Sequence, residues 1–272
     1  MRACCCRLPG GKGGLARREA LMLLVGATGT MMVGCSPQQG GGALASFVSP
    51  EEERQLGEQA FEKIKQEERV SGDAGLQQRL RSVGRRIVEA SRSSIPPGQW
   101  EFVVFAGDEL NAFALPGGHV GFYEGIFRVM RNDAQVAAVL GHEVGHVTAR
   151  HSAQRIGASQ ASQLGMSALQ IALGAGNVGF ANELAALLGA GVQYGVILPY
   201  SRAQELEADR LGLEYMARAG YDPAEALDFW QRMAASGGGK PPAFLSTHPS
   251  DAQRIEQLRE ALPRAQAIYR RG

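Results

Sequence analysis

Apolar residues recur at helical spacing along much of the chain. Between Pro50 and Ile95 they stand three and four positions apart, which predicts two amphipathic helices that cover a core. Residues 49–52 (SPEE) open the first helix, because proline suits a first turn and acids favour the positive end of a helix dipole. Further helices are predicted over residues 124–157, 201–219, 223–235 and 249–262, and a helical hairpin over the glycine- and alanine-rich residues 158–198.

A short sheet interrupts this helical pattern. Residues 100–106 (WEFVVFA) are rich in aromatic and β-branched side chains, while residues 111–115 (NAFAL) and 119–123 (HVGFY) flank a Pro-Gly-Gly turn. This order predicts one strand followed by a hairpin. The expected fold class is therefore α+β and mainly helical, with one small sheet.

The N-terminal segment has the pattern of an export signal. Residues 1–34 contain five basic side chains and one acidic one, and their apolar stretch, residues 21–34, has 14 residues. That is fewer than the roughly 20 residues with which a helix crosses a membrane. Residues 32–35 (MVGC) resemble a bacterial lipobox, which predicts a lipid on Cys35. An ordinary cleaved signal and an uncleaved anchor are the alternatives, and both would also export the domain.

The chain is expected to divide into three parts. Residues 1–34 form the lipoprotein signal peptide, residues 35–48 a flexible tether rich in glycine, glutamine and serine, and residues 49–265 one folded domain. A lipid on Cys35 would anchor this domain to a membrane in a bacterial periplasm. Ser36, standing where an aspartate would favour the inner membrane, points to the outer membrane.

Charge and cysteine content narrow the possible chemistry. The formal net charge is +1, but residues 1–34 contribute +4, so the remainder is mildly acidic. It has no basic stripe, and nucleic acid is not expected as a partner. Apart from three cysteines in the leader, Cys35 is the only cysteine, so a metal in the domain must be held by histidine and carboxylate side chains.

Residues 142–146 (HEVGH) form an HExxH motif inside a predicted helix. His142 and His146 are four residues apart, so both project from one face, about 6 Å apart along the helix axis. Two imidazoles so placed can bind one Zn²⁺ ion, while Glu143 can act on a water as a general base. The alternative is a buried helix with coincidental polar residues, which is costly because their polar groups would lack partners.

A hydrolytic zinc site needs a third protein ligand and one open position. Glu205 and Asp209, within residues 201–209 (SRAQELEAD), are four residues apart on a predicted helix. Glu205 can therefore bind the metal while Asp209 accepts a hydrogen bond from a ligating imidazole. Without the upstream motif, a solvated acidic face paired with nearby arginines would be the simpler interpretation.

Three segments together resemble a known family. Residues 142–151 (HEVGHVTARH), 205–209 (ELEAD) and 111–118 (NAFALPGG) are similar to the zinc metallopeptidases that include HtpX, the CAAX prenyl protease, BepA and LoiP. The resemblance covers roughly residues 50–262. It implies a gluzincin-type metallopeptidase domain with its small sheet beside the HExxH helix.

The resemblance also assigns roles to five residues. It implies that His142, His146 and Glu205 are the zinc ligands, that Glu143 is the catalytic glutamate, and that Asp209 orients a ligating histidine. The multiple transmembrane helices of HtpX and the helical repeat domain of BepA have no counterpart in the pattern. The nearest type is therefore a LoiP-like periplasmic lipoprotein peptidase.

Five further residues are weighed near such a site. His248, in a loop, is expected to be a fourth ligand or a transition-state donor, or else only to cap its loop. His119 could lie where a peptide substrate pairs with a strand, although an ordinary surface histidine also explains it. Tyr200 and Arg202 are candidate donors to a developing oxyanion. His151 is expected to turn away from the metal and to be structural.

The expected function is that of a zinc metalloendopeptidase in envelope protein quality control. Its partners would be misfolded or unassembled envelope polypeptides and, through the lipid, a membrane. One alternative is a lipid-anchored, zinc-stabilised scaffold or holdase with little proteolytic turnover. Another is a zinc amidase or peptidoglycan hydrolase, which fits the compartment but not the motifs. Because Glu143 and the ligands are all present, the peptidase is favoured.

Overall fold

The computed structural model describes residues 45, 47–159, 200–235, 242–248 and 252–271. The predicted signal peptide, most of the predicted tether and nearly all of the predicted hairpin at residues 158–198 lie outside the described residues. The divisions at residues 34, 48 and 265 therefore stay predictions.

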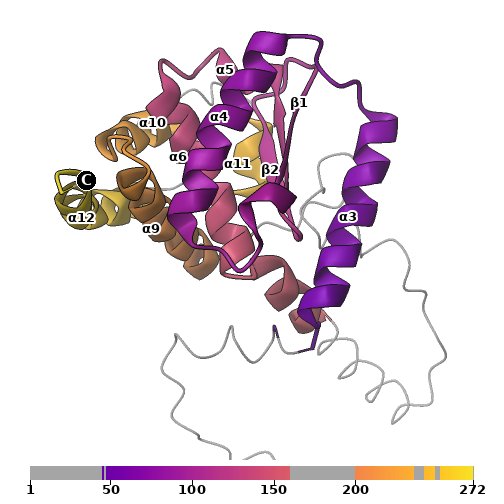
Figure 1. Ribbon diagram of the computed structural model, residues 1–272. Coiled ribbons are helices and arrows are strands. Elements are labelled where there is room, and N and C mark those ends of the chain that lie inside the picture. The colour runs from indigo at the N-terminus through magenta and orange to yellow at the C-terminus, as the bar shows by residue number, and fades with distance from the viewer. Residues whose placement is uncertain (1–44, 46, 160–199, 236–241, 249–251, 272) are drawn as a thin grey trace, which may run out of the picture. The chain divides into compact units, whose positions relative to one another are not determined.

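Three short strands form one mixed sheet (Figure 1). They are β1 (Glu101–Phe105), β2 (Ala112–Leu115) and β3 (His119–Tyr123), in the order β1-β3-β2. β2 and β3 form the predicted antiparallel hairpin, and β1 runs parallel to β3.

Helices make up most of the remaining described residues, as the sequence pattern predicts. None of the described helices is both long and apolar enough to cross a membrane. A further helical stretch covers residues 151–159. The elements are α3 (Pro50–Glu67), α4 (Ala74–Ser91), the 3-10 helix η1 (Pro97–Gln99), α5 (Glu124–Phe127), α6 (Asp133–Thr148), α9 (Arg202–Arg218), α10 (Ala224–Ala235), α11 (Ala243–Thr247) and α12 (Ala252–Tyr269).

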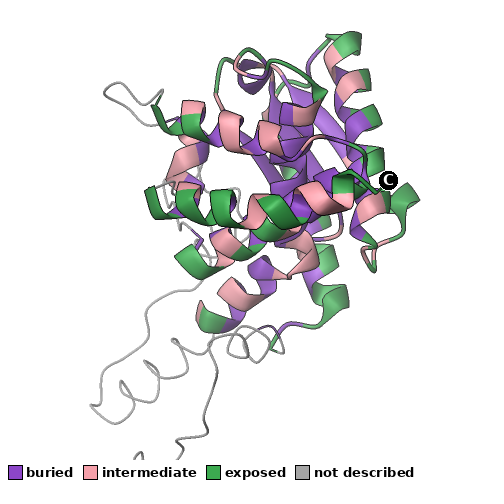
Figure 2. Cartoon of the chain, turned by 90° about the vertical axis from the view of Figure 1, so that its left-hand side faces the viewer, coloured by how far each residue is buried: buried purple, intermediate pink, exposed green. Residues whose placement is uncertain are grey.

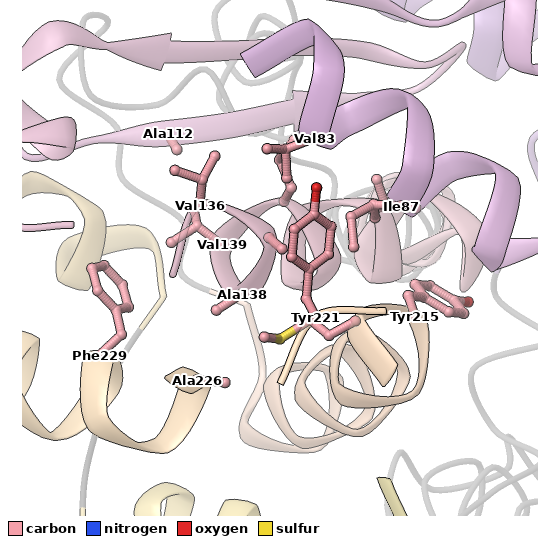
Figure 3. Packing of buried hydrophobic residues seen from close by; sticks show 14 of the residues in the cluster. Val83, Ile87, Ala112, Val136, Ala138, Val139, Tyr215, Tyr221, Ala226 and Phe229 are labelled. Carbon is pink, nitrogen blue, oxygen red and sulfur yellow. The ribbon is translucent and has the colours of Figure 1, made fainter. Parts of the chain in front are cut away.

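Both faces of the sheet are buried, which explains why its strands are almost continuously apolar. Successive side chains of a strand point to opposite faces. Phe102 and Val104 of β1 therefore join a core with α4 and α6, while Val103 and Phe105 join a second core with α3. Figure 2 shows the buried interior beneath the exposed outer faces of the helices. Figure 3 shows part of the first core, which includes Val83, Val136, Ala112, Tyr221 and Phe229.

The sequence predicts one continuous helix over residues 124–157, and this prediction is wrong. Asn132 begins a new helix, because its side chain accepts a hydrogen bond from the backbone N–H of Gln135 at 3.0 Å. α6 then ends before Arg150, which has a left-handed backbone with φ of 54°. A left-handed residue cannot continue a right-handed helix. Residues 124–157 therefore belong to three helices. At the other end of the chain, α12 extends to Tyr269, past the predicted end of the last helix at residue 262.

The described end of the predicted tether packs against the domain. Ala45 and Val48 are buried in the same core as α3. The guanidinium of Arg150 donates to the Val48 carbonyl at 2.8 Å and to the Glu53 carboxylate at 2.7 Å. Arg150 thus ties the chain before α3 to the segment that follows α6.

Candidate metal centre

The second half of α6 carries the HExxH motif into the interior. His142, Glu143 and His146 are each at most 2% exposed. α6 is buried continuously from Gln135 to His146, so its polar motif residues have no solvent to satisfy them. Their partners must come from other elements of the fold.

The backbones of α6 and α9 lie in close contact where small residues face each other. A Cβ atom added to Gly141 would lie 2.9 Å from the carbonyl oxygen of Gly212, and one added to Gly145 would lie 2.9 Å from that of Ala208. Only small residues permit this approach. It places Glu205, in the first turn of α9, opposite the two histidines.

Four buried side chains converge on one point. The ligand atoms of His142, His146, Glu205 and His248 all lie within 4.8 Å of one another. The Nε2 atoms of the two motif histidines are 3.1 Å apart, and Glu205 Oε1 lies 3.4 Å from Nε2 of His146. His248 Nδ1 lies 3.0 Å from Glu205 Oε1 and 3.1 Å from Nε2 of His142.

Asp209 and Arg254 hold the outer side of His142. Asp209 Oδ1 lies 2.8 Å from Nδ1 of His142. Its carboxylate also accepts hydrogen bonds from Nε of Arg254 at 2.6 Å and from Nη2 at 2.8 Å. A carboxylate accepts hydrogen bonds, so the proton of His142 is assigned to Nδ1 and the lone pair to Nε2. The structure thus brings Asp209 to the outer nitrogen of His142.

This donor set fits Zn²⁺. Nε2 of His142 carries no proton, and its lone pair faces Nε2 of His146. A cation between the two nitrogens could bind both of them. Two imidazole nitrogens and one carboxylate are one of the ligand sets found at catalytic zinc sites. Glu143 Oε1, also buried, has no hydrogen-bond partner among the described residues. Nε2 of His248 lies 3.4 Å from this oxygen.

Charge and burial shift the pKa values of the two glutamates in opposite directions. Burial raises the pKa of Glu143, which suits a group that takes up and releases a proton. Burial also acts to raise the pKa of Glu205, but the neighbouring His248 and Arg254 outweigh it and hold that pKa well below its ordinary value. Glu205 is therefore a carboxylate, the form in which it can bind a metal.

Tyr200 lies against the same group. Its ring centroid is 3.9 Å from that of His146 and 5.2 Å from that of His248. The Tyr200 backbone N–H donates to the Thr247 carbonyl at 3.1 Å, which joins the start of the α9 segment to the loop of His248. The structure thus brings both Tyr200 and His248 to the candidate centre.

Two other predicted residues, both within the described part of the chain, do not join this group. Arg202 is exposed and donates to Gln253 at 2.6 Å. His119 stacks on the Phe61 ring at 5.1 Å and lies 3.5 Å from Glu101. Cys35 lies outside the described residues.

Two buried residues near the candidate centre, Arg254 and His151, are not predicted from the sequence to take part in it. Arg254 carries no motif in the sequence, and nothing in its spacing indicates its ion pair with Asp209. The sequence predicts that His151 turns away from the metal. It does not join the four potential ligands, but its Nδ1 lies 2.9 Å from Nδ1 of His146. In both cases the contact depends on tertiary geometry.

A sequence profile of peptidase family M48 matches residues 75–262. The chain belongs to peptidase family M48. M48 peptidases use zinc, so the expected class of enzyme and its metal are confirmed at the level of the family. The mainly helical fold with a three-stranded sheet agrees with that assignment.

Several curated proteins of the M48 type are similar to the chain. The mitochondrial metalloendopeptidase OMA1 of Schizosaccharomyces pombe is 40% identical over 184 residues, which cover 67% of this chain and 52% of the relative. The beta-barrel assembly-enhancing protease of Escherichia coli K12 is 31% identical over 228 residues, covering 80% and 45%. The chain spans about half the length of these relatives.

Proposed function

We propose that the chain is a zinc metalloendopeptidase of the bacterial cell envelope that cleaves misfolded or unassembled envelope proteins in protein quality control. One observation carries the proposal. The ligand atoms of His142, His146 and Glu205 belong to a buried group within 4.8 Å, and Glu143 lies buried on the same helix as the two histidines. The names of the relatives, a metalloendopeptidase and a protease, support peptide cleavage.

The proposed chemistry assigns one role to each residue. His142, His146 and Glu205 would hold one Zn²⁺ ion. When bound, zinc would polarise the scissile carbonyl and lower the pKa of a water molecule, so that the water can give up a proton and attack the carbonyl carbon. Glu143 takes the proton from that water and later delivers it to the leaving amine. Asp209 holds the imidazole of His142 in the tautomer that presents Nε2.

His248 and Tyr200 would control the open side of the centre. His248 Nδ1 lies among the ligand atoms, and its Nε2 lies 3.4 Å from Glu143 Oε1. In this arrangement His248 would be the fourth ligand of a resting state and would have to move when a substrate binds. Once displaced, it would be placed with Tyr200 to donate to the developing oxyanion.

The compartment is proposed from the leader pattern. The relatives include both a mitochondrial enzyme and a beta-barrel assembly-enhancing protease, so their names do not decide it. A lipid on Cys35 would tether the domain in the periplasm, with the outer membrane favoured. In a bacterial host, the full chain should incorporate labelled palmitate and sediment with membranes, whereas Cys35→Ala should do neither. Labelling of the variant would contradict the proposal.

The central test replaces Glu143 by glutamine. Glu143→Gln should keep its zinc, because the residue is not a proposed ligand, but should lose cleavage of casein by about 100-fold or more. Cleavage is followed on gels with and without a chelator, and zinc by metal analysis. Glu58→Gln, the same exchange at an exposed position of α3, is the matched control and should cleave like the wild type.

Full cleavage by Glu143→Gln would contradict the peptidase mechanism. The scaffold or holdase alternative predicts a different pattern. Under that alternative the wild type would suppress aggregation of an unfolded protein without cutting it, and Glu143→Gln would do so equally well.

A further inference from the structure

The outer nitrogen of His146 faces another histidine. Nδ1 of His146 lies 2.9 Å from Nδ1 of His151, which is fully buried at 0% exposure. On its other side, His151 Nε2 lies 3.4 Å from Glu207 Oε2. The three side chains thus form a row from the candidate centre to Glu207, whose side chain is 48% exposed.

The hydrogens of this row have one consistent arrangement. The Glu207 carboxylate can only accept, so it draws the proton of a neutral His151 to Nε2. His151 Nδ1 then carries a lone pair and accepts the Nδ1–H of His146. His146 in turn presents the lone pair of Nε2 towards His142 and Glu205. This is the tautomer that a metal ligand requires.

A break in the helix makes the contact possible. In a continuous α-helix, residues five apart are rotated by about 140° around the axis and cannot face each other. Arg150, with φ of 54°, ends the run of α6 and turns the chain so that His151 returns to His146. The ion pair of Arg150 with Glu53 at 2.7 Å holds this turn.

We propose that His151 and Glu207 are positioning residues that fix the tautomer and the ring orientation of His146 at the zinc site. The inference rests on the proposed assignment of His146 as a ligand. It gives the second histidine of the motif a support of its own, separate from the Asp209 and Arg254 contacts of His142. Groups that support a ligand in this way commonly change metal affinity by about 10- to 100-fold when they are removed.

The test measures zinc affinity directly, by competition with a chromophoric chelator, in the full chain. His151→Leu removes the acceptor and should weaken zinc binding by about 10- to 100-fold. His151→Asn can place Oδ1 near the former Nδ1 position and should recover most of that loss. The absorption spectrum of the Co²⁺-loaded protein should change in the leucine variant and return towards that of the wild type in the asparagine variant.

Glu207 offers a second variant that leaves the interior intact. Because the side chain is half exposed, Glu207→Ala should fold normally and bind zinc several-fold more weakly, and Glu207→Gln should lie between Glu207→Ala and the wild type. Glu58→Gln is the control and should bind zinc as the wild type does. Thermal unfolding of the zinc-free proteins reports separately on the fold.

Three outcomes would overturn the proposal. One is unchanged zinc affinity and Co²⁺ spectrum in His151→Leu, or, if that variant does not fold, unchanged affinity in Glu207→Ala. Another is an asparagine variant as weak as the leucine variant, which would indicate a merely structural role. The last is tight zinc binding by His146→Ala, which would refute the ligand assignment itself. Only this last result would also count against the proposed zinc centre.

Discussion

At the scale of single residues, Arg254 forms ion pairs with two carboxylates that the fold buries. Its Nη1 atom lies 2.9 Å from Glu205 Oε2, and its Nε atom lies 2.6 Å from Asp209 Oδ2. The guanidinium also lies 4.7 Å from the ring centroid of Trp230. Arginine suits this place because its planar fork can bond two acceptors while its face rests on an aromatic ring.

Removing this guanidinium should therefore destabilise the domain. Arg254→Ala leaves Glu205 and Asp209 without their shared cation, and the loss of one partner from a buried ion pair costs about 3–5 kcal/mol. Urea unfolding of the zinc-free protein measures the change.

The same helix provides the control for this substitution. Arg259 forms an exposed pair with Glu256, so Arg259→Ala should change the free energy of unfolding by less than about 0.5 kcal/mol. Equal stability of the two variants would show that the buried network around Arg254 carries no net stabilisation.

Part of the candidate centre can be predicted from residue types at helical spacing. His142 and His146 had to share a helix face, and Glu205 and Asp209 had to share another, because these relations need only the local geometry of a helix. The contacts of Arg254 had no such signal, because they depend on how α12 packs beside α9.

At the scale of elements, the packing of α9 on α6 sets the distance between the proposed ligands. Gly212 lies at the contact, where an added Cβ atom would be 2.9 Å from the backbone nitrogen of His142. The close approach leaves no room for a Cβ atom at Gly212 or at Gly141.

Gly212→Ala should therefore separate the two helices. Overpacking of this kind typically costs about 1–3 kcal/mol, and zinc affinity should fall as Glu205 moves away from the histidines. The control is Gly98→Ala in η1, where an added Cβ would meet nothing within 4 Å and stability should change by less than about 0.5 kcal/mol. Unaltered zinc affinity in Gly212→Ala would refute this account of ligand spacing.

Two helices begin with the same capping arrangement, which provides a matched pair. Ser49 opens α3 and Ser201 opens α9, each in a capping box. Replacing either serine by alanine should cost about 1 kcal/mol in thermal or urea unfolding. Only Ser201→Ala should also weaken zinc binding, because Glu205 lies in the first turn of α9. Equal zinc affinities of the two variants would show that fraying of the first turn of α9 does not affect the position of Glu205 at the centre.

Most elements could be predicted because their periodicity is local. The hairpin of β2 and β3 follows from its turn residues, and the helices follow from apolar spacing. The parallel pairing of β1 with β3 could not be predicted, because it joins segments through an intervening strand. The left-handed Arg150 could not be predicted either, because a non-glycine residue adopts that conformation only where tertiary contacts hold it.

At the scale of the whole molecule, zinc should stabilise the fold by binding only its native form. The proposed ligands come from α6 and α9, which are brought together only by folding. With free zinc at about 100 times its Kd, the stabilisation is about 2.7 kcal/mol, which corresponds to a Tm shift of roughly 5–11 °C in a domain of this size.

Calorimetry with and without a chelator measures this shift. His146→Ala should show a much smaller difference between the two conditions, because the variant lacks a ligand. A wild-type Tm that does not depend on zinc would contradict binding at this centre.

The order of these residues along the chain also governs when the centre can assemble. A polypeptide that emerges N-terminus first from a ribosome or a translocation channel presents His142 and His146 early, Glu205 later and Arg254 last. The three proposed ligands are therefore all present once α9 has emerged, and Arg254, which pairs with Glu205 and Asp209, follows with α12. A chain that has emerged only as far as α6 carries both motif histidines but lacks Glu205, so its proposed metal centre is incomplete.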